Sequence, residues 1–311
     1  MLIIGHRGCN YKGYNQNTIR AYKKAISDGA KAIEMDVQLT KDNQLVVVHN
    51  LDLTQVSNGT GLVRETTFDK IESLHAGSVS NGIDKIPTLK EVFELIASYD
   101  SEDRPTLHLE LKGDDTGSPA GILLKNEFLD NELLTLDNIL ISSFNWKELE
   151  KIRKIIPNIR IALLDGSIRR KELLKKIENG KELFAKIFAY GLEDYMIPKS
   201  TNLEECIKYY NEQIKDKKIR SIIIEEVTRC LTGAYYNENL LYEATRMHAS
   251  SVNLLAFTAT KEFIEKAHKK GLKVFLYTVN KDFEIDRALD IKADGIFSDN
   301  FSYVANYVAN K

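Results

Sequence analysis

The chain has 311 residues, of which 43% are hydrophobic and 28% charged, so it is long enough to bury a large core. Its 43 Lys and Arg residues nearly balance its 45 Asp and Glu residues, and the net charge of -2 argues against a general nucleic-acid binder. Cys9, Cys206 and Cys230 are too widely spaced for a disulfide framework or a zinc site, and no apolar run could cross a membrane, so we expect a cytoplasmic globular protein.

The first predicted elements form a strand, helix, strand unit. Residues 2–4 are an apolar strand that leads directly into the turn Gly5-His6-Arg7-Gly8, so we expect no signal peptide. Thr18 can cap a helix that stops at Gly29. A second strand follows at residues 32–37, and the pattern is that of a βαβ unit.

The second strand carries two acidic side chains within an apolar run. Because successive side chains alternate between the two faces of a strand, Glu34 and Asp36 point the same way. Two unpaired carboxylates buried side by side would each cost several kcal/mol to desolvate. The pair therefore predicts a bound cation, although a structural network with buried Lys or Arg is an alternative.

A polar turn at residues 41–44 followed by an apolar run predicts a β-hairpin with the acidic strand. A four-residue loop pairs Thr40 with Leu45 and places Asp36 opposite His49, with their Cβ atoms about 5 Å apart. The hairpin thus predicts an imidazole beside the acidic pair. A change of register by one residue would turn His49 to the other face, and His49 would then merely cap the hairpin.

Residues 50–86 lack clear periodicity and are predicted to form a small irregular insertion. Thr88 and Glu91 form a capping box that starts a helix running to about residue 99. The strand that follows, residues 106–112, has leucines on one face and a polar set on the other. That polar set is His108, Glu110 and Lys112, of which His108 lies deepest and is expected to be structural.

Eight strands alternate mostly with helices and predict a single domain, residues 1–311, with a (β/α)8 TIM barrel fold. The predicted strands are residues 2–4, 32–37, 107–112, 139–143, 160–164, 251–254, 273–278 and 295–298. Helices are predicted at 261–270 and 282–291. Glu110 and Lys112 would lie at the C-terminal mouth, where such barrels hold their chemistry.

Residues 165–248 are too many for one barrel connection and predict an inserted, mainly helical subdomain after the fifth strand. Because βα loops emerge on the active-site face, this subdomain is expected to flank the site. Its basic run at 169–176 could contact an anionic membrane surface, but a solvated helix face is the commoner explanation.

The polar residues at the predicted strand ends suit phosphoester chemistry. They are His6, Arg7, Glu34, Asp36, His49, Glu110 and Lys112. Three carboxylates suit Mg²⁺ or Ca²⁺ better than Zn²⁺. Two imidazoles can act as acid and base near neutral pH, and an arginine and a lysine can bind an anionic substrate. Together they predict metal-assisted phosphoester chemistry.

The motifs of this chain resemble those of the glycerophosphodiester phosphodiesterase family, which shares a barrel with phosphatidylinositol-specific phospholipase C. The matching segments, in family order, are Gly5-His6-Arg7-Gly8, Asn17-Thr18, Glu34-Met35-Asp36-Val37, Val47-Val48-His49, Ile86-Pro87-Thr88-Leu89, Leu109-Glu110-Leu111-Lys112, Ser142-Ser143-Phe144, Tyr277-Thr278-Val279-Asn280 and Asp294-Gly295-Ile296-Phe297-Ser298-Asp299. They cover nearly the whole chain apart from residues 165–248.

The resemblance implies a role for each site residue. Glu34, Asp36 and Glu110 would bind one divalent cation, Mg²⁺ or Ca²⁺ with Mn²⁺ also possible, His6 and His49 would be the acid/base pair, Arg7 and Lys112 would hold the phosphate, and Tyr277 would form a wall for the glycerol. The implied substrate is a small glycerophosphodiester, and the implied products are glycerol 3-phosphate and an alcohol. In the family's usual mechanism the neighbouring glycerol hydroxyl attacks phosphorus and water then opens a cyclic phosphate.

Four positions depart from the family pattern. Gln16 and Asn50 replace acidic residues, Tyr277 replaces Trp and Phe301 replaces Pro. The first two changes remove negative charge near the predicted cation and could alter its affinity. Two other functions stay open: a lysophospholipase D-like activity on lipids, and a barrel that binds phosphodiesters without turning them over. The sequence predicts no oligomeric state.

Overall fold

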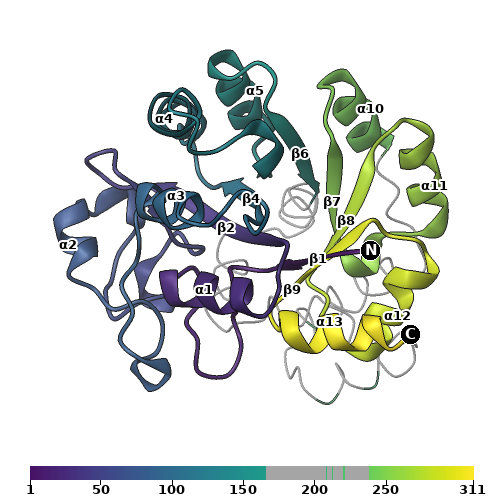
Figure 1. Cartoon of the computed structure of the whole chain (residues 1–311), viewed down its shortest axis with the longest axis horizontal. Coiled ribbons are helices and arrows are strands. Elements are labelled where there is room, and N and C mark those ends of the chain that lie inside the picture. Colours follow the sequence, from purple (N-terminus) through teal and green to yellow (C-terminus); the bar gives the residue numbers. More distant parts are fainter. Residues whose placement is uncertain (166–207, 209–211, 213–219, 221–237) are drawn as a thin grey trace.

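The computed structural model describes residues 1–165 and 238–311, together with residues 208, 212 and 220 (Figure 1). The β-strands in these residues are β1 (Leu2–Gly5), β2 (Ala32–Leu39), β3 (Leu45–Val47), β4 (Thr106–Leu111), β5 (Ile139–Ser143), β6 (Arg160–Asp165), β7 (Ser251–Leu255), β8 (Lys273–Tyr277) and β9 (Gly295–Ser298). The α-helices are α1 (Ile19–Ser27), α2 (Phe68–Glu72), α3 (Leu89–Ala97), α4 (Gly117–Leu123), α5 (Trp146–Ile155), α10 (Glu238–Arg246), α11 (Lys261–Lys269), α12 (Asp282–Asp290) and α13 (Phe301–Ala309).

All of these strands except β3 form one closed parallel barrel. The strand order is β1-β9-β8-β7-β6-β5-β4-β2, and β1 also pairs with β2, which closes the ring. The helices surround the strands in Figure 1, while β3 pairs antiparallel with the C-terminal residues of β2, 37–39. The predicted (β/α)8 barrel is therefore confirmed.

Alternation along the strands separates two cores. Side chains that point outward, such as Met35, Leu109 and Val252, join the large core under the helices. Inside the barrel, the ring of His108 packs edge-on against Phe275 and Phe297, with ring centroids 5.5 and 5.6 Å apart. Burial lowers the pKa of His108 to about 3, so it is neutral at pH 7 and packs as part of the interior.

The predicted helix signals act as expected. The Thr18 side chain accepts a hydrogen bond from the backbone N–H of Ala21 and begins α1, and Gly29 follows its end with a φ of 93°. Thr88 and Glu91 form the predicted capping box of α3. The observed ends of both helices lie within two residues of the predicted ones.

The predicted hairpin register is wrong by one residue. Leu39, and not Thr40, lies opposite Leu45. Thr40 closes the loop instead: its backbone N–H donates to the carbonyl oxygen of Gln44 at 2.9 Å, and its hydroxyl accepts from the Gln44 N–H at 2.9 Å. This side-chain bond draws Thr40 out of the ladder and lengthens the loop.

The predicted position of His49 directly opposite Asp36 is wrong for the same reason. The backbone N–H of Val48 donates to the Asp36 carbonyl oxygen at 2.9 Å, and β3 already ends at Val47. Because His49 lies beyond the ladder, the register does not decide where its imidazole points. His49 still reaches the interior of the barrel mouth, as described below.

The predicted insertion at residues 50–86 has a small core of its own. Val46, Val48, Leu53 and Ile71 are among the buried side chains of this core. Polar contacts tie the insertion to the barrel, because Arg20 of α1 donates through Nε and Nη2 to both carboxylate oxygens of Asp84, at 2.9 and 2.6 Å. Figure 1 shows this segment, with α2, lying to one side of the barrel.

Replacing Asp84 with Asn is expected to lower the free energy of unfolding by about 1 kcal/mol at pH 7, because a charge-assisted pair between the buried Asp84 and the partly exposed Arg20 is lost. The Arg20 guanidinium lowers the pKa of Asp84 in the folded protein, so its contribution is complete above the unfolded pKa of about 4 and disappears as the pH falls further. Urea unfolding at pH 7 and pH 3 measures this, with exposed Asp100→Asn as control. If the free energies of unfolding of wild type and Asp84→Asn differed by the same amount at both pH values, the prediction would be contradicted.

The predicted subdomain at residues 165–248 lies largely outside the described residues and stays a prediction, as does the helix face expected at 169–176. Its last helix is described: α10 buries Leu240, Leu241 and Ala244 in the large core against β6 and β7. That helix therefore belongs to the outer layer of the barrel. No helix in the described part of the chain has the length and apolar character needed to cross a membrane.

Candidate active site

The predicted site residues gather around one cavity of about 110 Å³ at the barrel mouth. Seven of the eight line it, namely His6, Arg7, Glu34, His49, Glu110, Lys112 and Tyr277, and Asp36 lies beneath them with 1% of its surface exposed. A larger hollow of about 340 Å³ lies elsewhere, between α1 and the insertion, and none of the predicted site residues lines it. The side chains predicted to act in catalysis and binding therefore surround the smaller cavity.

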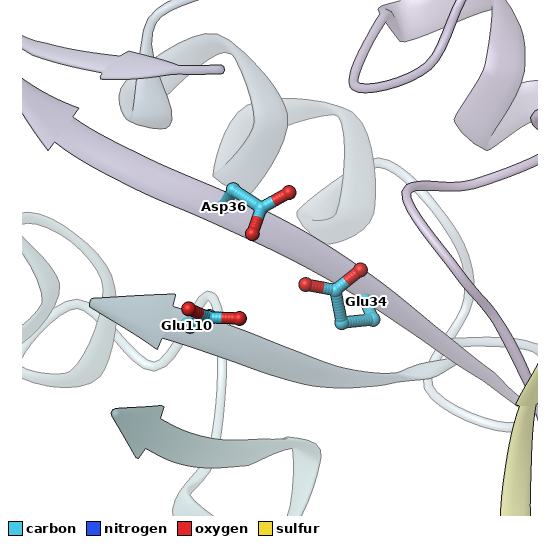
Figure 2. Close-up of side chains that lie close together, drawn as sticks. All are labelled: Glu34, Asp36 and Glu110. Carbon is cyan, nitrogen blue, oxygen red and sulfur yellow. The ribbon is translucent and has the colours of Figure 1, made fainter. Parts of the chain in front are cut away.

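Three carboxylates form the floor of this cavity. Figure 2 shows Glu34 and Asp36 on β2 and Glu110 on the adjacent β4. One carboxylate oxygen from each residue lies within 4.8 Å of the others. Burial raises the pKa of Glu34 and of Glu110, and the negative charge of Asp36 raises both further. The cluster is thus crowded with like charge, and a cation would relieve it.

The donor set of this cluster suits a hard divalent cation. All three side chains offer carboxylate oxygens, which Mg²⁺ and Ca²⁺ prefer. Asp36 Oδ1 is buried and has no hydrogen-bond partner among the described residues, although Lys112 Nζ lies 3.3 Å away. An acceptor left unbonded in this way remains available to a metal ion, so the residues present fit such an ion.

Two basic side chains flank the carboxylates. Lys112 Nζ lies 2.7 Å from Glu110 Oε1, and Arg7 Nε lies 3.3 Å from Asp36 Oδ2. Burial alone would raise the pKa of Asp36, but Lys112, His49 and Arg7 together lower it below its usual range. Asp36 is therefore ionised at neutral pH, and the two cations remain close enough to bind a phosphate as well.

The glycine-rich turn after β1 explains how Arg7 reaches this position. Arg7 has a φ of 56°, and its backbone N–H donates to Glu34 Oε2 at 2.9 Å. Gly8 follows with a φ of 81°, and a Cβ there would lie 2.8 Å from the backbone of Ala21 in α1. The motif Gly5-His6-Arg7-Gly8 therefore needs its second glycine for close packing as well as for the turn.

His6 is oriented by an acidic residue from the far end of the chain. Its Nδ1 lies 2.7 Å from Asp299 Oδ1, and its Nε2 lies 4.0 Å from Glu34 Oε2. Burial would raise the pKa of Asp299, but His6 and the Asn280 side chain lower it to about 2. An ionised carboxylate can only accept, so Nδ1 carries the proton and Nε2 is directed toward the carboxylate cluster.

His49 is oriented in the same way by a neutral neighbour. Its Nδ1 lies 2.7 Å from Asn50 Oδ1, the position at which the family usually has Asp, while the Asn50 amide donates to Gln55. Burial lowers the pKa of His49 to about 3, against the opposing effect of Asp36. The ring is therefore neutral at pH 7, and its Nε2, which carries no proton in this tautomer, can accept one.

Gln38 holds the segment that carries His49. Its side-chain amide nitrogen lies 2.8, 3.1 and 2.9 Å from the carbonyl oxygens of Val48, His49 and Asn50. Gln38 is on the same face of β2 as the acidic pair and is 4% exposed. This contact replaces the missing ladder bonds beyond β3 and fixes the imidazole at the cavity.

Three supporting residues had no role in the sequence interpretation. Asn17 donates to Asp36 Oδ2 at 2.8 Å and in turn accepts from the Tyr22 hydroxyl at 2.7 Å, while Gln38 and Asp299 position the histidines. Strand alternation alone could have placed Gln38 beside the acidic pair. Asn17 and Asp299 stood in segments that match the family, but only the folded structure shows what they contact.

Replacing Asp299 with Asn is expected to reduce turnover by roughly 10- to 100-fold, by analogy with losses seen when outer partners of site histidines are removed. An amide that turns its nitrogen toward Nδ1 would favour the opposite tautomer and misdirect Nε2. The measurement is kcat together with the pH profile of activity. Asp294→Asn is the matched control, because Asp294 contacts His268, which does not line the cavity. Unchanged kcat and pH profile would contradict this role for Asp299.

Tyr277 forms an aromatic wall with Phe144. Their ring centroids lie 6.2 Å apart, and the Tyr277 hydroxyl donates to the Asp165 carbonyl oxygen at 2.6 Å. Lys112 Nζ lies 5.9 Å from the Phe144 ring centroid. The ring of Tyr277 thus faces the cavity while its hydroxyl is held by β6.

Comparison with known proteins identifies related proteins, one of them over nearly the full length. The model of the glycerophosphoryl diester phosphodiesterase family matches residues 6–302. A glycerophosphodiester phosphodiesterase of Caldanaerobacter subterraneus is 28% identical over 99% of this chain and 97% of its own. One from Bacillus altitudinis is 36% identical over 52% of this chain and 65% of its own.

A similar fold occurs in a phosphodiesterase from Oleispira antarctica, whose structure contains the product sn-glycerol-3-phosphate. The TM-score is 0.70 at 19% identity, and the match covers 99% of this chain and 97% of that one. The predicted family resemblance is confirmed by the family match, which spans the barrel from the turn after β1 to the start of α13. The chain belongs to the glycerophosphoryl diester phosphodiesterase family.

Proposed function

We propose that this protein hydrolyses glycerophosphodiesters to glycerol 3-phosphate and an alcohol. One observation carries the proposal. Two histidines and two basic side chains line the same small cavity as a cluster of three carboxylates, whose oxygens lie within 4.8 Å of one another. The relatives named glycerophosphodiester phosphodiesterases support it, as does the product bound in the Oleispira structure.

The basic side chains bind and orient the phosphate. Arg7 presents a planar guanidinium and Lys112 a compact ammonium on either side of Asp36, so two phosphoryl oxygens can each meet a donor. Tyr277 and Phe144 form an apolar side of the cavity, against which the carbon chain of the glycerol can pack. The diester is thus held with its scissile bond between the histidines.

His6 and His49 transfer the protons. A glycerol hydroxyl next to the phosphoester attacks phosphorus, a new P–O bond forms, and the P–O bond to the alcohol breaks. One imidazole, neutral and unprotonated at Nε2, accepts the proton of the attacking hydroxyl, and the other, which enters the step as the imidazolium, donates its Nε2 proton to the departing alkoxide oxygen. Water then opens the cyclic phosphate with the two roles exchanged.

Glu34, Asp36 and Glu110 would hold one divalent cation, Mg²⁺ or Ca²⁺, with Mn²⁺ also suitable. When bound, such a cation supplies Lewis-acid polarisation of the phosphoryl oxygen and lowers the pKa of a nearby hydroxyl. The chain's own contribution is the oxygen cluster on β2 and β4, which Asn17 and the Arg7 backbone keep in place.

The test is release of glycerol 3-phosphate by the full chain, first stripped with a chelator and then supplied with Mg²⁺, Ca²⁺ or Mn²⁺. The substrates are glycerophosphocholine, glycerophosphoethanolamine, glycerophosphoglycerol and a lysophospholipid. Metal-dependent release from the small diesters is expected. Release from the lysophospholipid alone would favour the lysophospholipase D-like activity, and no release from folded, cation-binding protein would favour a phosphodiester-binding barrel.

A further inference from the structure

Asn253 of β7 is a buried polar residue that has no role in the proposed mechanism. Its side chain lines the active-site cavity, and only 1% of the residue is exposed. Neither its amide nitrogen nor its amide oxygen has a hydrogen-bond partner within the described ranges. Since buried amides are nearly always paired in native proteins, this one is available to something that enters the cavity.

The position of Asn253 in the barrel separates it from the charged groups. Counting in either direction around the ring, β7 is the fourth strand from β2, so Asn253 faces the acidic strand across the cavity. Its register neighbours are Leu164 on β6 and Phe275 on β8, both apolar. The amide is therefore a neutral hydrogen-bonding group within an apolar wall.

A neutral donor and acceptor suits a hydroxyl better than a phosphate or a cation. The phosphate belongs on the opposite side, with Arg7 and Lys112, and the attacking hydroxyl must stay beside it and the histidines. Because the cavity is only about 110 Å³ and Asn253 is almost fully buried, the group that reaches it must be small. The far end of a glycerol unit meets these conditions.

We propose that Asn253 recognises the terminal hydroxyl of the substrate's glycerol unit and so selects glycerol over diols that lack this group. The inference rests on the proposed function and adds the residue that hydrogen-bonds the glycerol. Ser251, two residues earlier on the same face, also has a buried hydroxyl without a hydrogen-bond partner in the described part of the chain, but it does not line the cavity. An internal water is the alternative partner of Asn253.

The test compares two substrates that differ by one oxygen: glycerophosphocholine, and the diester with propane-1,2-diol in place of glycerol. Both retain the hydroxyl next to the phosphoester. Wild-type protein is expected to prefer the glycerol diester in kcat/KM by roughly 10- to 100-fold, the value of one buried hydrogen bond. In Asn253→Leu, which has similar shape and no polar atom, this preference should fall to near one.

Isothermal calorimetry with glycerol 3-phosphate and propane-1,2-diol 1-phosphate gives a readout that does not need turnover, and the same loss of preference is expected there. Ser251→Ala is the control and should keep the wild-type preference. If Asn253→Leu does not fold, Asn253→Ser replaces it, because this exchange removes the amide and leaves only a short hydroxymethyl group.

The outcomes separate the inference from the proposed function. No turnover of either diester by wild-type protein contradicts the proposed function, and the calorimetric preference still decides the role of Asn253. An equal loss for both ligands in Asn253→Leu would show that Asn253 only holds a water or supports packing, and would overturn the inference. A wild-type protein that does not distinguish the two phosphates would overturn it as well.

Discussion

Replacing Glu34 with Gln is expected to lower turnover of a glycerophosphodiester by about 10³-fold or more, while the barrel stays folded. The exchange is isosteric, but it removes one of the three proposed anionic ligands, and cation binding of this kind supplies several kcal/mol of transition-state stabilisation. Initial rates at saturating Mg²⁺ or Ca²⁺ measure the loss, and isothermal calorimetry measures the accompanying loss of cation affinity.

Thermal unfolding distinguishes this effect from damage to the fold. Burial and the charge of Asp36 raise the pKa of Glu34, so its negative charge is unfavourable in the metal-free protein. In chelator, Glu34→Gln should therefore unfold at the same temperature as wild type or higher, and only the wild type should gain stability when the cation is added. Glu94→Gln, the same exchange at an exposed position of α3, should change neither property. Near-normal turnover by Glu34→Gln would overturn its assignment as a ligand.

The barrel and the acidic cluster could be predicted because both follow from periodicity. Alternation in the strand of Glu34 and Asp36 fixes which side chains face inward, and leucines in the strand of Glu110 fix the outward face. In a parallel barrel the inward faces of the strands meet at the C-terminal mouth, and this does not depend on the sequences of the connecting loops. A local pattern therefore sufficed to place the three carboxylates within 4.8 Å of one another.

The orientation of the histidines could not be predicted in the same way, because it depends on contacts across the fold. His6 and Asp299 are 293 residues apart and meet only because β9 pairs with β1. The hairpin register failed because one hydroxyl, that of Thr40, competes with the ladder for a backbone N–H. Gln38 compensates for the short strand by holding the chain at His49, a contact with no signature beyond strand alternation.

The two histidines consequently share an orientation but not a partner. Each directs Nδ1 outward and Nε2 toward the cavity, yet His6 contacts the ionised Asp299 and His49 contacts the neutral Asn50. The charge missing at Asn50 is one of the four departures from the family pattern. Asn50 Oδ1 lies 2.7 Å from Nδ1, so an amide oxygen accepts the hydrogen bond that a carboxylate could accept there, without the negative charge of a carboxylate.

Replacing His49 with Ala is expected to reduce turnover by about 10³-fold, within the range typical for loss of a general acid or base. The imidazole lines the cavity, but His49 is not one of the three residues proposed to bind the cation. The affinity for the cation should therefore stay within a few-fold of wild type. This combination, lost turnover with retained cation binding, separates His49 from Glu34. Steady-state rates and calorimetry on the same preparations measure both properties.

The control for His49→Ala is His75→Ala, the same exchange at a half-buried position of the insertion that does not line the cavity. That variant should keep wild-type turnover. Asn50→Asp provides a second comparison, since it restores the usual acidic partner at Nδ1 and should support turnover while shifting the pH profile of activity. If His49→Ala retained near-normal turnover, proton transfer would have to be assigned to another group at the cavity, and the paired roles of His6 and His49 would be wrong.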